Sequence, residues 1–341
     1  MYSSSLPLGA RLSILAGLLA LATACKKDRD VATALPDAVS FTQNGLYPEG
    51  TQYDDQRGQF LVSSQTAGRI GQVTDAGAYS TFADDAQLIS TIGLKLDAAR
   101  SRLLVAVSDP GYNPARTTAA TKGKLAALAI FNSSTGAKTD YVDLGAFTPA
   151  GGATYPAHFA NDIAVDDAGN AYVTDSFAPI IYKVDAQGTV TRLLENAALA
   201  APSGKFGLNG IVYHPGGYLI VAKSDEGALL KVPLANPASF TKVTLPTGLS
   251  LSGDDGLQLL DNTTLLAVCN AQGKVYKLTT TTGFASVANA ATDAYTTGNV
   301  YPTTLARRAD AKSYVLYSYL NALQTMQSPP VSEFRLQALP F

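Results

Sequence analysis

The chain has 341 residues and a formal net charge of −2, and only 15% of its residues are charged. A charge this small leaves no basic surface to hold nucleic acid, so the composition excludes a nucleic-acid partner. With 29 glycines, 17 tyrosines and no long stretch of helical periodicity, the sequence predicts an all-β protein of short strands and tight turns.

The first 24 residues have the features of an export signal. Arg11 precedes an apolar run over 12–21, which is too short to span a bilayer as a helix. Small residues at 22–24 then lead into Cys25, and this pattern resembles a bacterial lipoprotein signal, although Leu21 stands four places before the cysteine instead of the usual three. An ordinary cleaved signal peptide is the alternative.

Three segments follow from this interpretation. Residues 1–24 are the expected lipoprotein signal peptide, and a lipid on Cys25 would anchor the exported protein to a membrane of the bacterial cell envelope. Residues 25–37 are charged at their start and poor in large apolar side chains, so we expect a flexible tether. Residues 38–341 then form one domain.

One short phrase recurs six times in this domain: a leading residue, in most copies polar, then in most copies Gly or Asp, and then a strand of alternating apolar residues. The copies begin at Glu49, Ile92, Asn161, Asn209, Asp255 and Thr303. Most are 43 to 48 residues apart, which is the length of a four-stranded propeller blade. The longer gap of 69 residues before Asn161 contains a loop insertion rich in Pro, Gly and Thr at 109–123. The sequence therefore predicts a six-bladed β-propeller.

A propeller must also close its ring. The alternating run Ala38–Thr42 is the candidate to add a strand beside the last blade, which would remove exposed sheet edges. Radially repeated blades bring equivalent positions to one central channel. We therefore expect Glu49, Asn161, Asn209 and Asp255 to face one point.

These four residues offer two carboxylates and two amide oxygens, with no His or Cys among them. Hard oxygen donors of this kind suit Ca²⁺, or another divalent cation, better than soft metals. Asp254 would replace Asp255 if the register slipped by one residue, but the alternation of Leu257 and Leu259 favours Asp255.

The phrases also resemble those of a known family, the senescence-marker-protein/gluconolactonase-like family of calcium-dependent lactonases and esterases, which includes phosphotriesterase-like members. The matching stretches lie within residues 47–280 in the family's order: Pro48-Glu49-Gly50, Asn161-Asp162-Ile163-Ala164-Val165-Asp166, Gly169-Asn170-Ala171-Tyr172-Val173-Thr174-Asp175, Leu208-Asn209-Gly210-Ile211 and Asp255-Gly256. The resemblance implies that Glu49, Asn209 and Asp255 bind the metal and that Asn161 lies beside the substrate. Asp255 and Asn161 would then take part in catalysis. Phe159 stands where sugar-lactonase members commonly have Arg, which argues against a gluconolactone-like sugar acid.

Other candidates carry weaker signals. His158, three residues before Asn161, is a candidate base or substrate-binding residue near the mouth of the channel, and its alternative role is a hydrogen-bonded loop residue. Cys269, in an apolar strand, has no expected chemistry. Asp175 and the stretch Lys223-Ser224-Asp225 follow inner strands, where they would either line the channel or cap turns.

Two functions from different classes fit these observations. The first is a metal-dependent hydrolase of a small-molecule lactone or ester. The second is a surface lipoprotein whose propeller binds a ligand or partner without turnover and holds a structural calcium. No feature of the sequence specifies an oligomeric state.

Overall fold

The computed structural model describes residues 35–295, 297–309 and 312–341. The expected signal peptide, the lipidation of Cys25 and most of the tether lie outside this part of the chain. The β-structure belongs to one compact unit, Pro36–Phe341. None of the helices in the described residues has the length and apolar character that crossing a bilayer requires.

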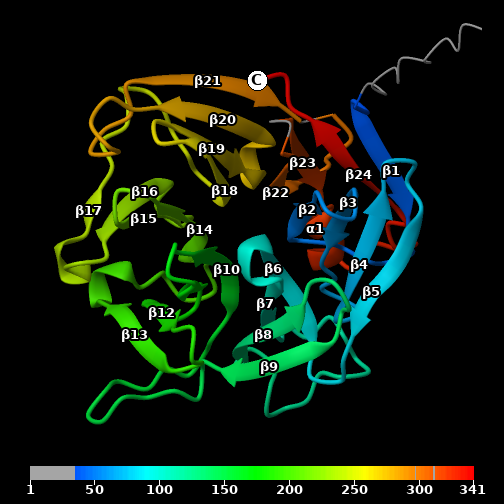
Figure 1. Cartoon of the computed structure of the whole chain (residues 1–341), viewed down its shortest axis with the longest axis horizontal. Helices are drawn as coiled ribbons and strands as arrows, with labels where there is room; N and C mark the ends of the chain where they lie inside the picture. The colour runs from blue at the N-terminus through cyan, green and yellow to red at the C-terminus, as the bar shows by residue number, and fades with distance from the viewer. Residues whose placement is uncertain (1–34, 296, 310–311) are drawn as a thin grey trace, which may run out of the picture. The chain divides into compact units, whose positions relative to one another are not determined.

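Within the described residues, 24 strands form six antiparallel sheets of four strands, arranged in a ring around a central axis (Figure 1). The first three sheets are β2 (Thr51–Asp54), β3 (Gln59–Val62), β4 (Arg69–Thr74) and β5 (Tyr79–Asp84); β6 (Ser90–Asp97), β7 (Arg102–Ser108), β8 (Ala126–Asn132) and β9 (Lys138–Asp143); β10 (Ala160–Val165), β11 (Ala171–Asp175), β12 (Ile180–Val184) and β13 (Val190–Glu195).

The next two sheets are β14 (Leu208–His214), β15 (Tyr218–Lys223), β16 (Ala228–Pro233) and β17 (Thr241–Lys242); β18 (Asp254–Asp261), β19 (Thr264–Cys269), β20 (Lys274–Thr279) and β21 (Asn289–Ala294). The sixth combines both ends of the described chain: β22 (Pro302–Arg307), β23 (Ser313–Tyr317), β24 (Glu333–Ala338) and β1 (Ala38–Thr42). Short helices are η1 (Ala98–Arg100), η2 (Ala197–Leu199), η3 (Pro237–Ser239), η4 (Asn270–Gln272) and α1 (Leu320–Gln324).

The predicted six-bladed β-propeller is confirmed, and so is its closure by the N-terminal strand. β1 pairs with β24 from Ala38 opposite Gln337 to Thr42 opposite Glu333. Aromatic packing joins this last blade to the first, since the ring centroids of Phe60 and Tyr314 lie 5.1 Å apart. The pairing removes a free sheet edge that would otherwise be open to association.

The recurring phrase marks a β-bulge in five of the six inner strands. The register shifts lie at Thr91/Leu94, Ala160/Ile163, Leu208/Ile211, Asp254/Leu257 and Pro302/Leu305. A bulge leaves its residues outside the regular ladder and re-aims their side chains. In four of these five strands the first residue of the phrase, freed in this way, lines the central cavity: Ile92, Asn161, Asn209 and Asp255.

The second residue of the phrase is glycine in four blades because neighbouring blades meet there. A Cβ added at Gly50 would lie 2.3 Å from the carbonyl oxygen of Ile92, and one added at Gly210 would lie 2.1 Å from that of Asp255. Gly93 and Gly256 face the next blade in the same way. A side chain at these positions would push adjacent blades apart at the axis.

Candidate functional site

The loops at one end of the propeller enclose a cavity of about 820 Å³. Its wall includes the first residue of five of the six phrases: Glu49, Ile92, Asn161, Asn209 and Asp255. The sixth, Thr303, is fully buried, and its hydroxyl donates to the carbonyl oxygen of Glu49 at 2.7 Å. The expected convergence of these positions is therefore what the structure shows.

The two asparagines present their oxygens without partners. Asn161 Nδ2 donates to Ser176 Oγ at 2.9 Å, and Asn209 Nδ2 donates to Ser224 Oγ at 3.1 Å. Each serine hydroxyl donates its own proton to a backbone carbonyl oxygen, that of Leu208 or Asp254, so it can only accept from the amide. This fixes which end of each amide is the oxygen, and both Oδ1 atoms are buried with no hydrogen-bond partner in the protein. Leaving a buried acceptor unpaired costs about 1–3 kcal/mol, so this pair of oxygens fits a cation that they would coordinate.

The two carboxylates are buried close to other acids. Burial raises the pKa of Glu49 well above its usual range, and the negative charges of Asp255 and Asp162 add to the effect. Burial likewise raises the pKa of Asp255 to about 7, with a further contribution from Asp162, although Asn270 donates to its Oδ2 at 2.7 Å. A divalent cation would offset the repulsion that ionisation creates here.

The donor set therefore fits a hard divalent cation. Over residues 35–295, 297–309 and 312–341, no three His, Cys, Asp or Glu side chains cluster as metal ligands. The candidate centre depends instead on its mixture of Glu49 and Asp255 with the amides of Asn161 and Asn209. Such oxygen ligands are typical of calcium sites.

Asp254 and Asp255 have different surroundings. Asp255 lines the cavity, whereas Asp254 is fully buried and lies opposite Cys269 across β18 and β19. The register that the alternation of Leu257 and Leu259 favoured is therefore the one observed. Cys269 is also fully buried, and burial raises the pKa of its thiol, which gives it no accessible chemistry.

The structure does not bring His158 to the central cavity. His158 instead lines a second cavity of about 570 Å³. Its Nδ1 lies 2.6 Å from Oδ2 of the fully buried Asp175. Asp175 Oδ1 accepts from the backbone N–H groups of Phe159, Phe177 and Ala178 at 2.9 to 3.0 Å. His158 and Asp175 thus hold the loops beside the central cavity, and neither residue lines that cavity.

For four of the six leading side chains, a hydrogen-bond partner lies 15 residues further along the chain. This spacing joins Asn161 to Ser176, Asn209 to Ser224, Asp255 to Asn270 and Thr303 to Ser318. Each partner follows the second strand of its blade. Sequence reasoning missed these orienting residues, apart from placing Ser224 near the channel, although the constant spacing would have identified them.

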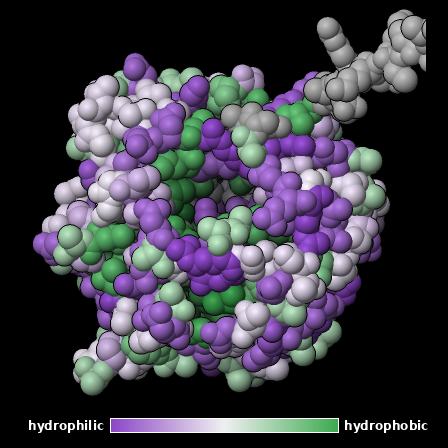
Figure 2. Space-filling model, viewed as in Figure 1, coloured by the Kyte–Doolittle hydropathy of each residue, from purple (hydrophilic) through white to green (hydrophobic). Residues whose placement is uncertain are grey.

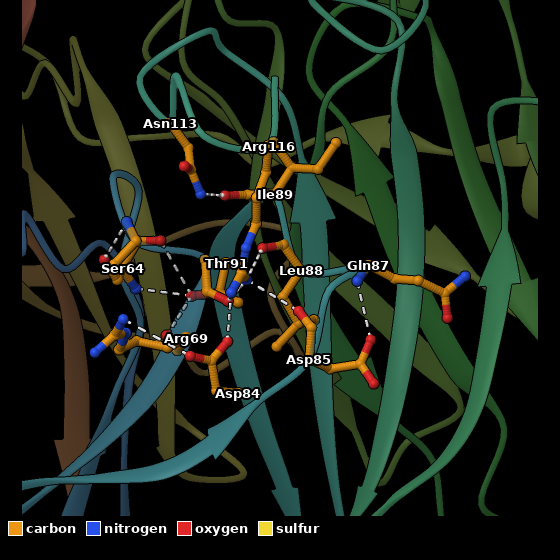
Figure 3. Close-up of polar contacts among 12 residues, drawn as sticks. Ser64, Arg69, Asp84, Asp85, Gln87, Leu88, Ile89, Thr91, Asn113 and Arg116 are labelled. Carbon is orange, nitrogen blue, oxygen red and sulfur yellow. Dashed lines mark hydrogen bonds and ion pairs between the residues drawn. The ribbon is translucent and has the colours of Figure 1, made fainter. Parts of the chain in front are cut away.

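The insertion at 109–123 is an ordered part of the cavity wall. The Arg116 guanidinium donates to the carbonyl oxygens of Gly68, Asp85 and Leu88 at 2.7 to 2.9 Å and pairs with Asp84 at 2.6 Å (Figure 3). Asn113 Nδ2 donates to the carbonyl oxygen of Ile89 at 2.7 Å, as the same view shows. These bonds attach the insertion to the first two blades and place Tyr112 and Lys122 at the cavity.

Comparison with known proteins gives structural neighbours only. No protein-family model and no curated protein sequence matches the chain. Among solved structures, the major allergen Mala s 1 of Malassezia sympodialis aligns with a TM-score of 0.72 and 19% identity, over 89% of this chain and 96% of the other. Regucalcin of Agrobacterium tumefaciens strain C58, described as a calcium-binding protein, aligns with a TM-score of 0.56 and 18% identity, over 87% of this chain and 92% of the other.

A putative gluconolactonase gives a TM-score of 0.57 and 13% identity over 88% of this chain and 92% of the other. The fold is that of a gluconolactonase- and regucalcin-like propeller. At these identities the likeness extends to the fold, which agrees with the resemblance that the phrases indicated. In this propeller the N-terminal ends of the inner strands lie around one cavity. The chemistry that the protein can perform depends on the residues at that cavity, since a fold alone does not determine function.

Proposed function

We propose that this propeller binds Ca²⁺, or another divalent cation, through Glu49, Asn209 and Asp255, with Asn161 beside it, and hydrolyses a lactone or small ester. The observation that carries the proposal is the pair of buried amide oxygens without partners, which belong to two asparagines held by serines in the wall of the cavity that two buried carboxylates also line. The fold shared with a putative gluconolactonase and a calcium-binding regucalcin supports it.

The chain's own residues would divide the work as follows. Glu49 and Asp255 would supply the negative charge that a divalent cation requires, Asn209 would supply a neutral oxygen, and Asn161 would lie on the substrate side of the cation. A bound cation of this kind acts as a Lewis acid toward a carbonyl oxygen. Asp255, whose carboxylate lines the cavity, is also the candidate to accept a proton from water. Asn270 holds that carboxylate in place from the neighbouring loop.

Thermal unfolding in calcium and in chelator tests the binding step. A ligand at about 100 times its dissociation constant stabilises the folded state by about 2.7 kcal/mol, so calcium should raise the melting temperature. Glu49→Gln removes one carboxylate charge and should shrink this rise. Glu333→Gln, the same change at an exposed position on β24, and Cys269→Ser should leave it unchanged.

Hydrolysis of a panel of lactones and esters, with and without calcium, tests the chemical step. Calcium-dependent turnover that Glu49→Gln reduces would support the proposal. Calcium binding without turnover of any member of the panel would favour the second function, a propeller that binds a ligand or partner around a structural calcium.

The export signal adds a proposal about location. We propose that the mature protein begins at a lipid-modified Cys25 and is held at a membrane of the cell envelope. The support is the apolar run and the small residues before Cys25. The cavity would then act on small molecules outside the cytoplasm.

A further inference from the structure

Three phenylalanines form one wall of the central cavity. Phe159 precedes β10, Phe177 joins β11 to β12, and Phe206 precedes β14. Their ring centroids lie 5.1 to 5.4 Å apart, so each ring contacts the other two. All three line the same cavity as Glu49 and Asp255. We call this cluster of Phe159, Phe177 and Phe206 the phenylalanine wall.

The wall leaves apolar surface open to solvent. Phe206 is 38% exposed, and among the residues that the structure describes only Phe206 and Met326 are large hydrophobic residues with this degree of exposure. Figure 2 shows the ring hollowed at its centre, with hydrophobic residues in green and hydrophilic residues in purple around the opening. Apolar surface kept open inside a cavity marks a place where a ligand binds.

The wall is held rigidly from behind. The backbone N–H groups of Phe159 and Phe177 both donate to Oδ1 of Asp175, at 2.9 and 3.0 Å. Asp175 is fully buried and is itself held by His158. A fixed apolar surface binds an apolar group without first having to be ordered, which favours affinity.

The wall and the candidate cation centre are close in the chain as well as in space. Phe159 is two residues from Asn161, and Tyr301 and Leu320 extend the apolar lining beside the acidic end. The three phenyl rings offer no hydrogen-bond donor or acceptor. A polyhydroxylated substrate would leave its hydroxyls unpaired against them, whereas an alkyl or aromatic group would be desolvated favourably.

We propose that the substrate is a lactone or ester with an alkyl or aromatic substituent, which binds against the phenylalanine wall while the reacting carbonyl faces the acidic end of the cavity. This inference rests on the proposed hydrolysis and specifies its substrate class.

Two δ-lactones test it, because they share the reacting ring and differ only in what the ring carries. δ-Dodecalactone has an alkyl chain and glucono-δ-lactone has hydroxyl groups. With calcium present, we expect kcat/KM for δ-dodecalactone to be at least about tenfold higher, a difference of about 1.4 kcal/mol. Phe206→Ser, at the exposed ring, should lower that value about tenfold while glucono-δ-lactone hydrolysis stays unchanged.

Phe177→Ser repeats the test at a second ring. Phe82→Ser is the matched control, because Phe82 lies on β5, contacts Arg57 and lines neither of the two cavities. A preference for glucono-δ-lactone, or an equal loss on both lactones in the Phe206 and Phe177 variants, would overturn the inference. Thermal melts of each variant show that it is folded.

Binding of a lactam separates this inference from the proposed hydrolysis. The lactam analogue of δ-dodecalactone keeps the ring and the alkyl chain, and its amide bond resists hydrolysis. Calorimetry should show binding to the wild type that Phe206→Ser weakens and Phe82→Ser does not. If neither lactone is turned over but this pattern holds, the proposed hydrolysis fails and the apolar ligand class stands. If the lactam does not bind, or binds all variants equally, the ligand class is wrong.

Discussion

Replacing Asp255 by Asn should stabilise the cation-free protein at pH 8 and remove its stabilisation by calcium. The substitution keeps the size of the side chain and an oxygen that accepts from Asn270, but it removes the charge. In the cation-free protein that charge is buried beside Glu49 and Asp162, where its ionisation opposes folding. With calcium present, the same charge is a ligand, so the two conditions should give effects of opposite sign.

The magnitude follows from the raised pKa. A carboxyl group whose pKa is higher in the folded protein than in the unfolded chain binds its proton more tightly when folded. That contribution is fully present below the unfolded value of 3.8 and is lost as the pH rises to about 7. Because each pKa unit corresponds to about 1.4 kcal/mol, the wild type should lose about 4 kcal/mol of unfolding free energy at Asp255 between pH 4 and pH 8.

Urea unfolding at pH 4 and pH 8, in chelator and in calcium, measures these effects. In chelator, Asp255→Asn should match the wild type at pH 4 and exceed it by about 2 to 4 kcal/mol at pH 8. Asp261→Asn is the control, since Asp261 is an exposed carboxylate on the same strand β18. A variant that is equally destabilised at both pH values, or that calcium still stabilises like the wild type, would refute the assignment of Asp255.

Three further predictions concern other parts of the chain. Arg116→Ala leaves three backbone carbonyl oxygens without their donor, so it should lower the unfolding free energy by about 1–3 kcal/mol. It should also speed proteolysis of the insertion at 109–123, and unchanged cleavage would contradict the anchoring role of Arg116. Cys25→Ser should move the protein from the membrane fraction to the soluble fraction, and unchanged partitioning would argue against lipidation. Cys269, buried with a raised pKa, should react with a thiol reagent only after unfolding, and rapid labelling of the folded protein would contradict its placement.

The blades were predictable because the repeated phrase records a backbone requirement. Glycine is needed where the backbone of one blade contacts the backbone of the next, as at Gly50, Gly93, Gly210 and Gly256. The distance between these glycines in the sequence therefore reflects the length of a blade. The cavity-lining positions of Glu49, Asn161, Asn209 and Asp255 were predictable for the same reason. Each stands immediately before the position at which its blade meets the next.

Other features lacked a readable signal. His158 is three residues from Asn161, but its ring contacts the carboxylate of Asp175 and not the central cavity. That contact depends on packing within the blade, which the sequence does not reveal. Arg116 donates to backbone carbonyls, which look alike in any sequence, so its partners could not be inferred. Phe206 lies in a loop, and only the fold places it against Phe159 and Phe177.

The pairing of β1 with β24 has a consequence for the order of folding. Five sheets are built from strands that are neighbours in the chain, so their contacts close short loops. The sixth also pairs three neighbouring strands, but its fourth strand requires Ala38 to find Gln337, which closes a loop of almost the whole domain. Contacts so distant in sequence slow folding. We therefore expect the pairing of β1 with β24 to be the final, slowest step, after the sequence-local strands of all six blades have paired, and a nascent chain to remain an open ring until its C-terminal strand has been made.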